Sequence, residues 1–215
     1  MEILINITDA KEINRIPHIR ELIVLCYMVN TNESARDQFL RISTGSDTNA
    51  SMRDRIYGII QLSSLTYEGM VKADSVLKKI SDIIPKNLHP EIAWLRKEIK
   101  LKNSFYGKVL TPIRNELGFH FSHSLANLPL HKNVPHIPPV LAHLKDENDS
   151  ELVYVLPTEI VSSYLLSLIS EPTNPIKRLE WLIKQLGVYN NRIGSLLREG
   201  VYAIMKDIEP KLQVK

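Results

Sequence analysis

The chain has 215 residues, 44% of them hydrophobic, which is enough apolar material for one large domain with its own core. Charged residues make up 24% and the formal net charge is +3, so the composition permits an anionic partner without requiring one. The single cysteine, Cys26 in the apolar run ELIVLCYMV, excludes an intrachain disulfide and predicts a buried thiol in a reducing compartment.

The N-terminal quarter of the chain is predicted to be mainly helical. The run MEILINI, residues 1–7, is typical of a short strand or an arm. Two helices are predicted next, over about residues 17–29, with Pro17 near the first turn, and over residues 33–42. The segment TGSDTNAS, residues 44–51, is rich in turn-forming residues and predicts a loop.

The longest predicted element is an amphipathic helix over residues 51–84. Ser51 is a suitable N-cap, and Pro85 ends the pattern. Apolar residues recur at steps of three and four: Ile56, Ile59, Ile60, Tyr67, Met70, Val71, Leu77, Ile80 and Ile84. The spacing predicts one helix of about nine turns.

Two further helices are predicted before residue 125. The first is short and has one apolar face, formed by Ile92, Leu95 and Ile99. The second is capped by Asn103 or Ser104 and runs to about His123. Pro112 lies within it, so we expect a kink or a restart at Thr111.

The C-terminal half begins with a proline-rich loop, residues 127–157, whose role the sequence leaves open. Within it, LVYVL at residues 152–156 predicts a short strand. Helices are predicted over residues 158–208, with a break near Gly187. The segment EPTNP, residues 171–175, supplies an N-cap asparagine and a proline at the first helical position.

These elements predict an all-α fold in one domain, residues 1–215, built as a bundle of long antiparallel helices with N- and C-terminal helical extensions. No signal-peptide pattern is present, and Pro157 and Glu159 interrupt the most apolar window. We therefore expect a cytoplasmic protein that does not cross a membrane.

The stretch IRNELGFHFSH, residues 113–123, combines an apolar pattern with residues suited to chemistry. On an ideal helix, one stripe is formed by Leu110, Ile113, Leu117, Phe121 and Ser124. Arg114 and His120 border this stripe on opposite sides, whereas Asn115 points away from it. Both border positions suit a cleft between packed surfaces, and they equally suit a structural ion pair of Arg114 with Glu116 or Glu91.

The order Arg114, Asn115 and then His120 after four intervening residues resembles the motif of the HEPN superfamily. That motif is an arginine, a polar residue, a short spacer and a histidine on a late helix of a helical bundle. The resemblance covers about residues 51–125, a HEPN-like core that we place at residues 51–126. It implies an all-α HEPN-like bundle.

Many HEPN proteins are metal-independent endoribonucleases, so the resemblance implies cleavage of an RNA substrate by attack of a ribose 2′-hydroxyl on the adjacent phosphate. It implies catalytic roles for Arg114, which would stabilise phosphoryl charge, for His120 as acid or base, and for Asn115 in orientation. It further implies a homodimer with a composite site, a toxin or defence setting, and an antitoxin or nucleotidyltransferase as partner. Some members are catalytically silent binding modules, and that alternative stays open, as does an unrelated helical fold.

Two other groups of residues are candidate sites. Histidines 120, 123, 131, 136 and 143 lack the fixed ligand set of a zinc site, so we expect no metal and no cofactor. Basic residues precede the motif: Lys78, Lys79, Arg96, Lys97, Lys100, Lys102 and Lys108. Because Asp82, Glu91 and Glu98 are interspersed among them, the pattern favours a solvated helix face, with attraction of an RNA backbone as the alternative.

Overall fold

The computed structural model describes residues 16–43, 49–118, 143–144, 152–153, 155–170 and 172–212. Its helices are α2 (Ile19–Ser43), α3 (Asn49–Lys79), η1 (Lys86–Leu88), α4 (His89–Lys100), η2 (Tyr106–Leu110), η3 (Ile113–Gly118), α5 (Val155–Ser167) and α6 (Pro175–Leu212). Strands β1 (His143–Leu144) and β2 (Leu152–Val153) form one short antiparallel ladder. The all-α class and the helical bundle are confirmed.

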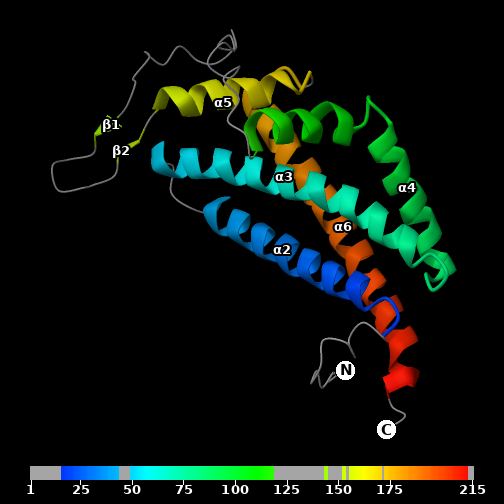
Figure 1. The fold of residues 1–215 in the computed structure, drawn as a ribbon. Helices are drawn as coiled ribbons and strands as arrows, with labels where there is room; N and C mark the ends of the chain where they lie inside the picture. The colour runs from blue at the N-terminus through cyan, green and yellow to red at the C-terminus, as the bar shows by residue number, and fades with distance from the viewer. Residues whose placement is uncertain are drawn as a thin grey trace.

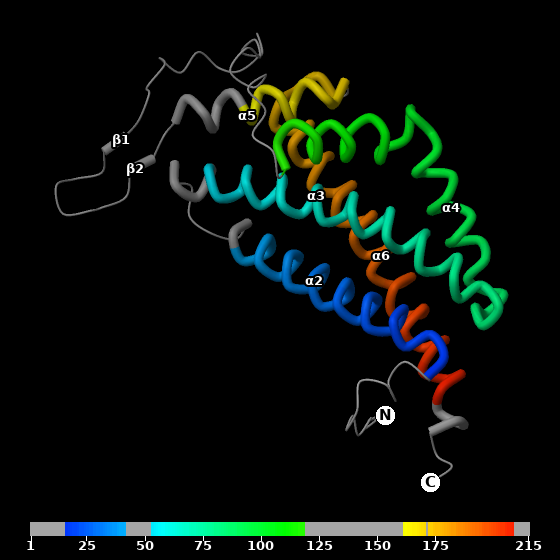
Figure 2. The backbone as a smooth tube through the Cα atoms, in the orientation of Figure 1, coloured from blue at the N-terminus to red at the C-terminus, as the bar shows by residue number. Residues whose placement is uncertain are grey.

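Helix α3 is the central element of the bundle. It packs against α2, α4, α5, α6 and the segments η2 and η3, and Figure 1 shows α2 and α3 side by side in opposite directions. Ile59, Met70 and Leu77 of α3 have no exposed surface. The tube in Figure 2 shows the start of α2 and the end of α6 at the same end of the bundle. The helices predicted as extensions therefore pack directly on the core.

Helix α2 is continuous, so the prediction of two helices, over residues 17–29 and 33–42, was wrong. The expected gap contains Asn30, Thr31 and Asn32, which are poor helix formers. Asn32 instead exchanges side-chain hydrogen bonds with Asn190 of α6, which is 1% exposed. A buried amide pair of this kind stabilises the helical conformation through tertiary contact, which outweighs local propensity.

Helix α6 runs unbroken through Gly187, so the predicted break there was also wrong. The start of the helix was predicted correctly. Pro175 is its first residue, and the Asn174 side-chain oxygen accepts a hydrogen bond from the Lys177 N–H at 3.1 Å. A single glycine costs a helix only about 1 kcal/mol relative to alanine, and the packing of α6 on α2 and α3 offsets that cost.

The predicted long helix begins earlier than expected, at Asn49, so Ser51 lies inside the helix and is not its N-cap. It also ends earlier, at Lys79 instead of Ile84. The chain tightens here, because the Ile83 N–H bonds to the Ile80 carbonyl at 3.1 Å, three residues back. Pro85 disfavours a helical conformation in the residue before it. Ile80 and Ile84 are nevertheless buried, so the apolar spacing continues beyond the helix that it predicted.

Four smaller predictions concern a strand, a thiol, the membrane and an arm. The strand predicted over residues 152–156 is limited to Leu152–Val153, because α5 begins at Val155. The thiol of Cys26 is exposed on α2, not buried as predicted, although partial desolvation raises the pKa of Cys26. None of the helices within the described ranges combines the length and apolarity that a membrane crossing requires. The arm predicted over residues 1–7 lies outside the described residues.

Two glycine-to-alanine substitutions are expected to change stability in opposite directions. A Cβ at Gly107 would lie 2.6 Å from the Lys102 carbonyl oxygen and 2.8 Å from that of Leu101, whereas nothing lies within 4 Å of one at Gly187. Gly107→Ala should lower the free energy of unfolding by about 1–3 kcal/mol through overpacking. Gly187→Ala should raise it by about 0.5–1 kcal/mol. Urea unfolding followed by circular dichroism measures both, and changes of the same sign would contradict this assignment.

Candidate functional site

The candidate site lies on a helical segment, residues 105–118, that contains two π-helical turns, η2 and η3. The Ser104 hydroxyl accepts a hydrogen bond from the Gly107 N–H at 3.0 Å, which confirms its predicted capping role. The Thr111 N–H bonds to the Tyr106 carbonyl five residues back, and the Thr111 hydroxyl donates to the same oxygen at 2.9 Å. The predicted distortion near Pro112 therefore takes the form of widened turns, which relieve the clash of a proline ring with the preceding turn.

The buried face of this segment was predicted correctly as far as the structure describes it. Leu110 and Ile113 are fully buried and Leu117 is 2% exposed. All three belong to the core cluster, and η3 packs against α3. Phe121 and Ser124, the other two stripe residues, lie outside the described residues. The stripe thus fixes which side of the helix faces α3, and with it the direction of the polar residues beside it.

Arg114 borders the stripe and forms an ion pair with Glu68 of α3. Its Nε donates to Glu68 Oε1 at 3.0 Å, with 32% of the arginine side chain and 37% of the glutamate side chain exposed. Of the two sequence-based candidates for this pairing, Glu91 was wrong, because it pairs with Arg192 of α6. The pair joins η3 to α3 near the surface, where part of the guanidinium meets solvent.

Asn115 lies on the exposed side of the segment, as the helical projection predicted. Arg114 Nη1 nevertheless donates to Asn115 Oδ1 at 3.3 Å. The structure therefore brings together two of the three predicted site residues. His120, the third, lies outside the described residues, as do the later histidines at 123, 131 and 136.

Two stacked tyrosines complete the surroundings of Arg114. The rings of Tyr67 on α3 and Tyr106 on η2 lie 4.8 Å apart and nearly parallel, and the Arg114 guanidinium carbon lies 5.7 Å from the centre of the Tyr67 ring. Burial, then a hydrogen bond with Tyr67, raises the pKa of Tyr106 far above its ordinary value. Tyr106 therefore stays neutral at physiological pH and serves as a hydrogen-bonding group, not as a base.

Gly118 brings the end of η3 into close contact with α3. A Cβ there would lie 2.7 Å from Ser64 Oγ, so only a glycine allows this approach without displacing the serine. The hydroxyls of Ser63 and Ser64 are buried on α3 and have no hydrogen-bond partner among the described residues. Gly118 thus lies against the serine face of α3.

Sequence reasoning missed Glu68, Tyr67 and Tyr106 as neighbours of Arg114. Tyr67 was assigned to the apolar stripe of the long helix, but nothing in the sequence distinguishes Glu68 from other surface carboxylates. The signal that identifies it is the packing of η3 on α3. Among the described residues, no group of three or more histidine, cysteine or acidic side chains could hold a metal ion.

Similarity to known proteins does not add to this geometry. Comparison of the whole chain with protein-family models, with curated proteins and with solved structures found no match. The HEPN assignment therefore rests on the motif residues Arg114, Asn115 and His120 and on the order of the helices, and it stays a prediction.

A double-mutant cycle on Arg114→Ala and Glu68→Ala should give a coupling energy of about 0.2–1 kcal/mol in urea unfolding, because solvent screens a pair that is one-third exposed. The Arg198–Glu33 pair, at 2.7 Å and with similar exposure, is the matched control and should give a similar value. A coupling above about 3 kcal/mol for the first pair would mark it as a buried-type structural pair instead.

Proposed function

We propose that the chain is a metal-independent endoribonuclease of the HEPN type, with Arg114, Asn115 and His120 at the reacting site. The observation that carries the proposal is the position of Arg114. Its guanidinium is oriented by Glu68 and Asn115, on a π-helical turn, and remains one-third exposed. Turns of this kind recur at functional sites. Arginine has five N–H donors, and two of them bond to these neighbours, which leaves others for phosphoryl oxygens.

The proposed reaction transfers a phosphoryl group within the RNA. The ribose 2′-oxygen attacks the adjacent phosphorus, the bond from phosphorus to the 5′-oxygen breaks, and a 2′,3′-cyclic phosphate remains. One histidine takes the 2′-hydroxyl proton and a second gives a proton to the leaving oxygen. Arg114 stabilises the charge that gathers on the phosphoryl oxygens, and Asn115 orients the phosphate or sugar. Two copies of His120 require two copies of the chain, so we propose a homodimer with a composite site.

A catalytically silent helical module that binds a protein or nucleotide partner is the second candidate. The Arg114–Glu68 pair and the contact of Arg114 with Tyr67 favour it, because they give Arg114 a structural role that involves no reaction. The proposed setting for either function is the cytoplasm. There the chain would act as a toxin or defence protein, with an antitoxin or a nucleotidyltransferase as its partner.

Cleavage of RNA in excess chelator is the direct test. Folded wild-type protein should cleave mixed RNA, and His120→Ala and Arg114→Ala should each lower the rate by about 10²-fold or more, since each removes one contribution to the transition state. Arg114→Lys should recover little, because lysine lacks the forked donors. Gel separation of labelled RNA gives the rates, and melting curves check the fold.

Arg198→Ala is the matched control, because it removes another half-exposed, ion-paired arginine and should leave cleavage unchanged. If folded wild-type protein cleaves none of several RNA pools, the silent module becomes the better assignment. If cleavage persists in both motif variants, the nuclease activity belongs to other residues or to a contaminant.

Subunit mixing tests the composite site. Light scattering should give about twice the mass of one chain. When wild-type and His120→Ala chains are co-expressed in equal amounts, only dimers of two wild-type chains carry both histidines, so activity should fall to about one quarter. Activity of one half, or the mass of a monomer, would contradict a site that needs both copies.

A further inference from the structure

The positive charge of the chain is concentrated just before the candidate site. Residues 86–108 contain six basic and two acidic side chains, a net charge of +4, whereas the whole chain carries +3. The rest of the sequence is therefore close to neutral. Charge concentrated in about a tenth of a chain produces a local positive potential that the overall composition conceals.

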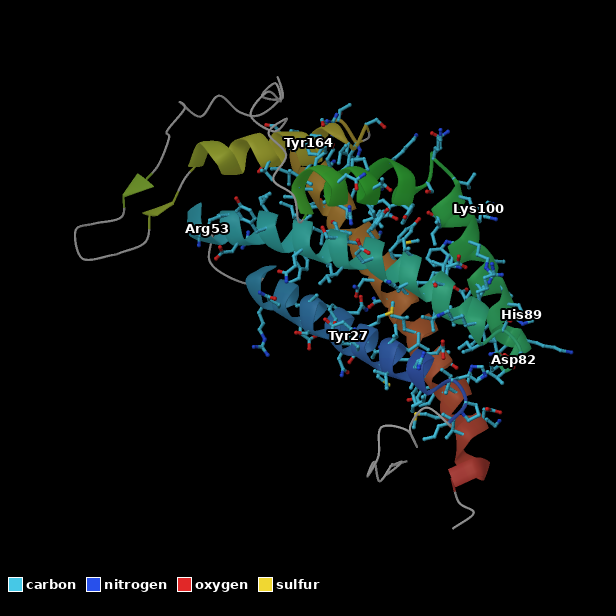
Figure 3. All side chains as sticks on the ribbon, in the orientation of Figure 1. Tyr27, Arg53, Asp82, His89, Lys100 and Tyr164 are labelled. Atoms are coloured by element: carbon cyan, nitrogen blue, oxygen red, sulfur yellow. The ribbon has the colours of Figure 1, made fainter. Side chains whose placement is uncertain are left out.

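The lysines of this segment lie on the outer side of the bundle. On α4 the exposed positions include His89, Ala93, Lys97 and Lys100, which recur at three- and four-residue steps and so form one face. Figure 3 shows His89 and Lys100 at the two ends of α4, away from α2. Lys102 follows in the connecting turn, and it is exposed too.

Exposed residues also occur on the helical segment that carries the candidate site. Lys108 of η2 is exposed and precedes Arg114 by six residues on the same helical segment. Asn115, which accepts the hydrogen bond from Arg114, is exposed farther along that segment. We define the lysine track as Lys97, Lys100, Lys102 and Lys108. The track leads from the outer face of α4 to the segment that carries Arg114.

The two acidic residues of the segment lie on the side of α4 that is directed toward α6. Glu91 forms two hydrogen bonds with Arg192, and this pairing lowers the pKa of Glu91. Burial, then the neighbouring carboxylate of Glu98, raises the pKa of Tyr189, so Glu98 also lies beside a residue of α6. In sequence these carboxylates are interspersed with the lysines, which favoured a solvated, mixed-charge face; in space they lie on another side of α4.

The basic residue of α4 that does have a partner is likewise turned away from the track. Arg96 donates to Asp74 of α3 at 2.9 Å. Within the part of the chain that the structure describes, none of the four track lysines forms an ion pair or a side-chain hydrogen bond. The four ammonium groups are thus exposed to solvent without a carboxylate partner, so each is available to an anion.

We propose that the lysine track binds the phosphate backbone of RNA and guides the strand toward Arg114. Lysine ammonium groups act as point charges toward phosphate and release condensed counterions on binding, without reading sequence. The surface lacks the apolar anchors of a protein interface: its exposed large apolar side chain among the described residues is Leu101, at 46%. The inference that the strand is guided toward Arg114 rests on the proposed function, but RNA binding by the lysine track is measurable without cleavage.

Binding to a labelled single-stranded RNA whose 2′-oxygens are methylated tests the track, because that RNA cannot be cleaved by 2′-attack. Replacing all four track lysines with glutamine should raise the dissociation constant about tenfold or more at moderate salt. The slope of log affinity against log salt should become shallower by about 0.7 for each phosphate that the variant no longer neutralises. Fluorescence anisotropy over a salt series measures both quantities.

The matched control replaces four exposed lysines elsewhere with glutamine and changes the net charge by the same amount: Lys72, Lys177, Lys184 and Lys206. It should change the dissociation constant less than twofold. Equal weakening by both sets would mean that only net charge matters, and it would overturn the track. So would unchanged binding in the track variant, or track-dependent binding of anionic vesicles or of acidic protein in place of RNA.

The outcomes separate this inference from the proposed nuclease. Lysine-dependent RNA binding by a folded chain that never cleaves RNA supports the track and removes the nuclease, leaving an RNA-binding module. Cleavage that depends on Arg114 and His120 but not on the track lysines supports the nuclease and overturns the track. Loss of both binding and cleavage in the track variant, with both retained in the control, supports the two together.

Discussion

The burial of α3 between the other helices is the constraint on which the rest of the structure depends. α2, α4, α5, α6 and the segments η2 and η3 all pack against it, and residues such as Ile59 and Met70 have no exposed surface. Its neighbours bury part of their apolar stripes against α3, and α2 and α6 also pack on each other. The same helix supplies Glu68 to Arg114 and the serine face to Gly118, so the geometry of the candidate site is set by core packing and not by a loop.

Much of the fold could be predicted from the sequence, because apolar spacing indicated helix in all the long helices, although it wrongly divided α2 and α6. The capping residues Ser104 and Asn174 correctly marked the starts of two helical segments. The helix predictions failed where a residue far away in the sequence determines the local conformation. Asparagine is a poor helix former, yet the side-chain amide of Asn32 is hydrogen-bonded to Asn190, which lies 158 residues away in the sequence. For the site, spacing predicted that Arg114 borders the stripe, but it could not identify Glu68 as its partner, because that pairing exists only after η3 docks on α3.

Helix α4 shows why a charge pattern in a sequence cannot be interpreted without knowing how the helix packs. Along the sequence of this segment, acidic residues are interspersed with lysines, so the pattern indicates a surface of mixed charge. In the bundle, Glu91 pairs with Arg192 of α6 and Glu98 lies beside Tyr189 of α6, because positions seven residues apart share one face of a helix. Both carboxylates are therefore directed toward α6, whereas the lysines occupy the exposed face of α4. The packing of α4, and not its composition, creates the lysine track to which we assign RNA as the ligand.

The contacts between α2 and α6 have a consequence for how the protein is made. Glu33 meets Arg198 and Asn32 meets Asn190, across 165 and 158 residues of chain. A ribosome adds roughly 5–20 residues per second, so α2 emerges roughly 10–30 s before its partner is synthesised. During that interval the nascent chain holds an apolar helix pair, α2 and α3, with one side uncovered. The side of α2 and α3 that α6 covers is thus exposed until α6 has been made, and truncation within α6 would leave it exposed.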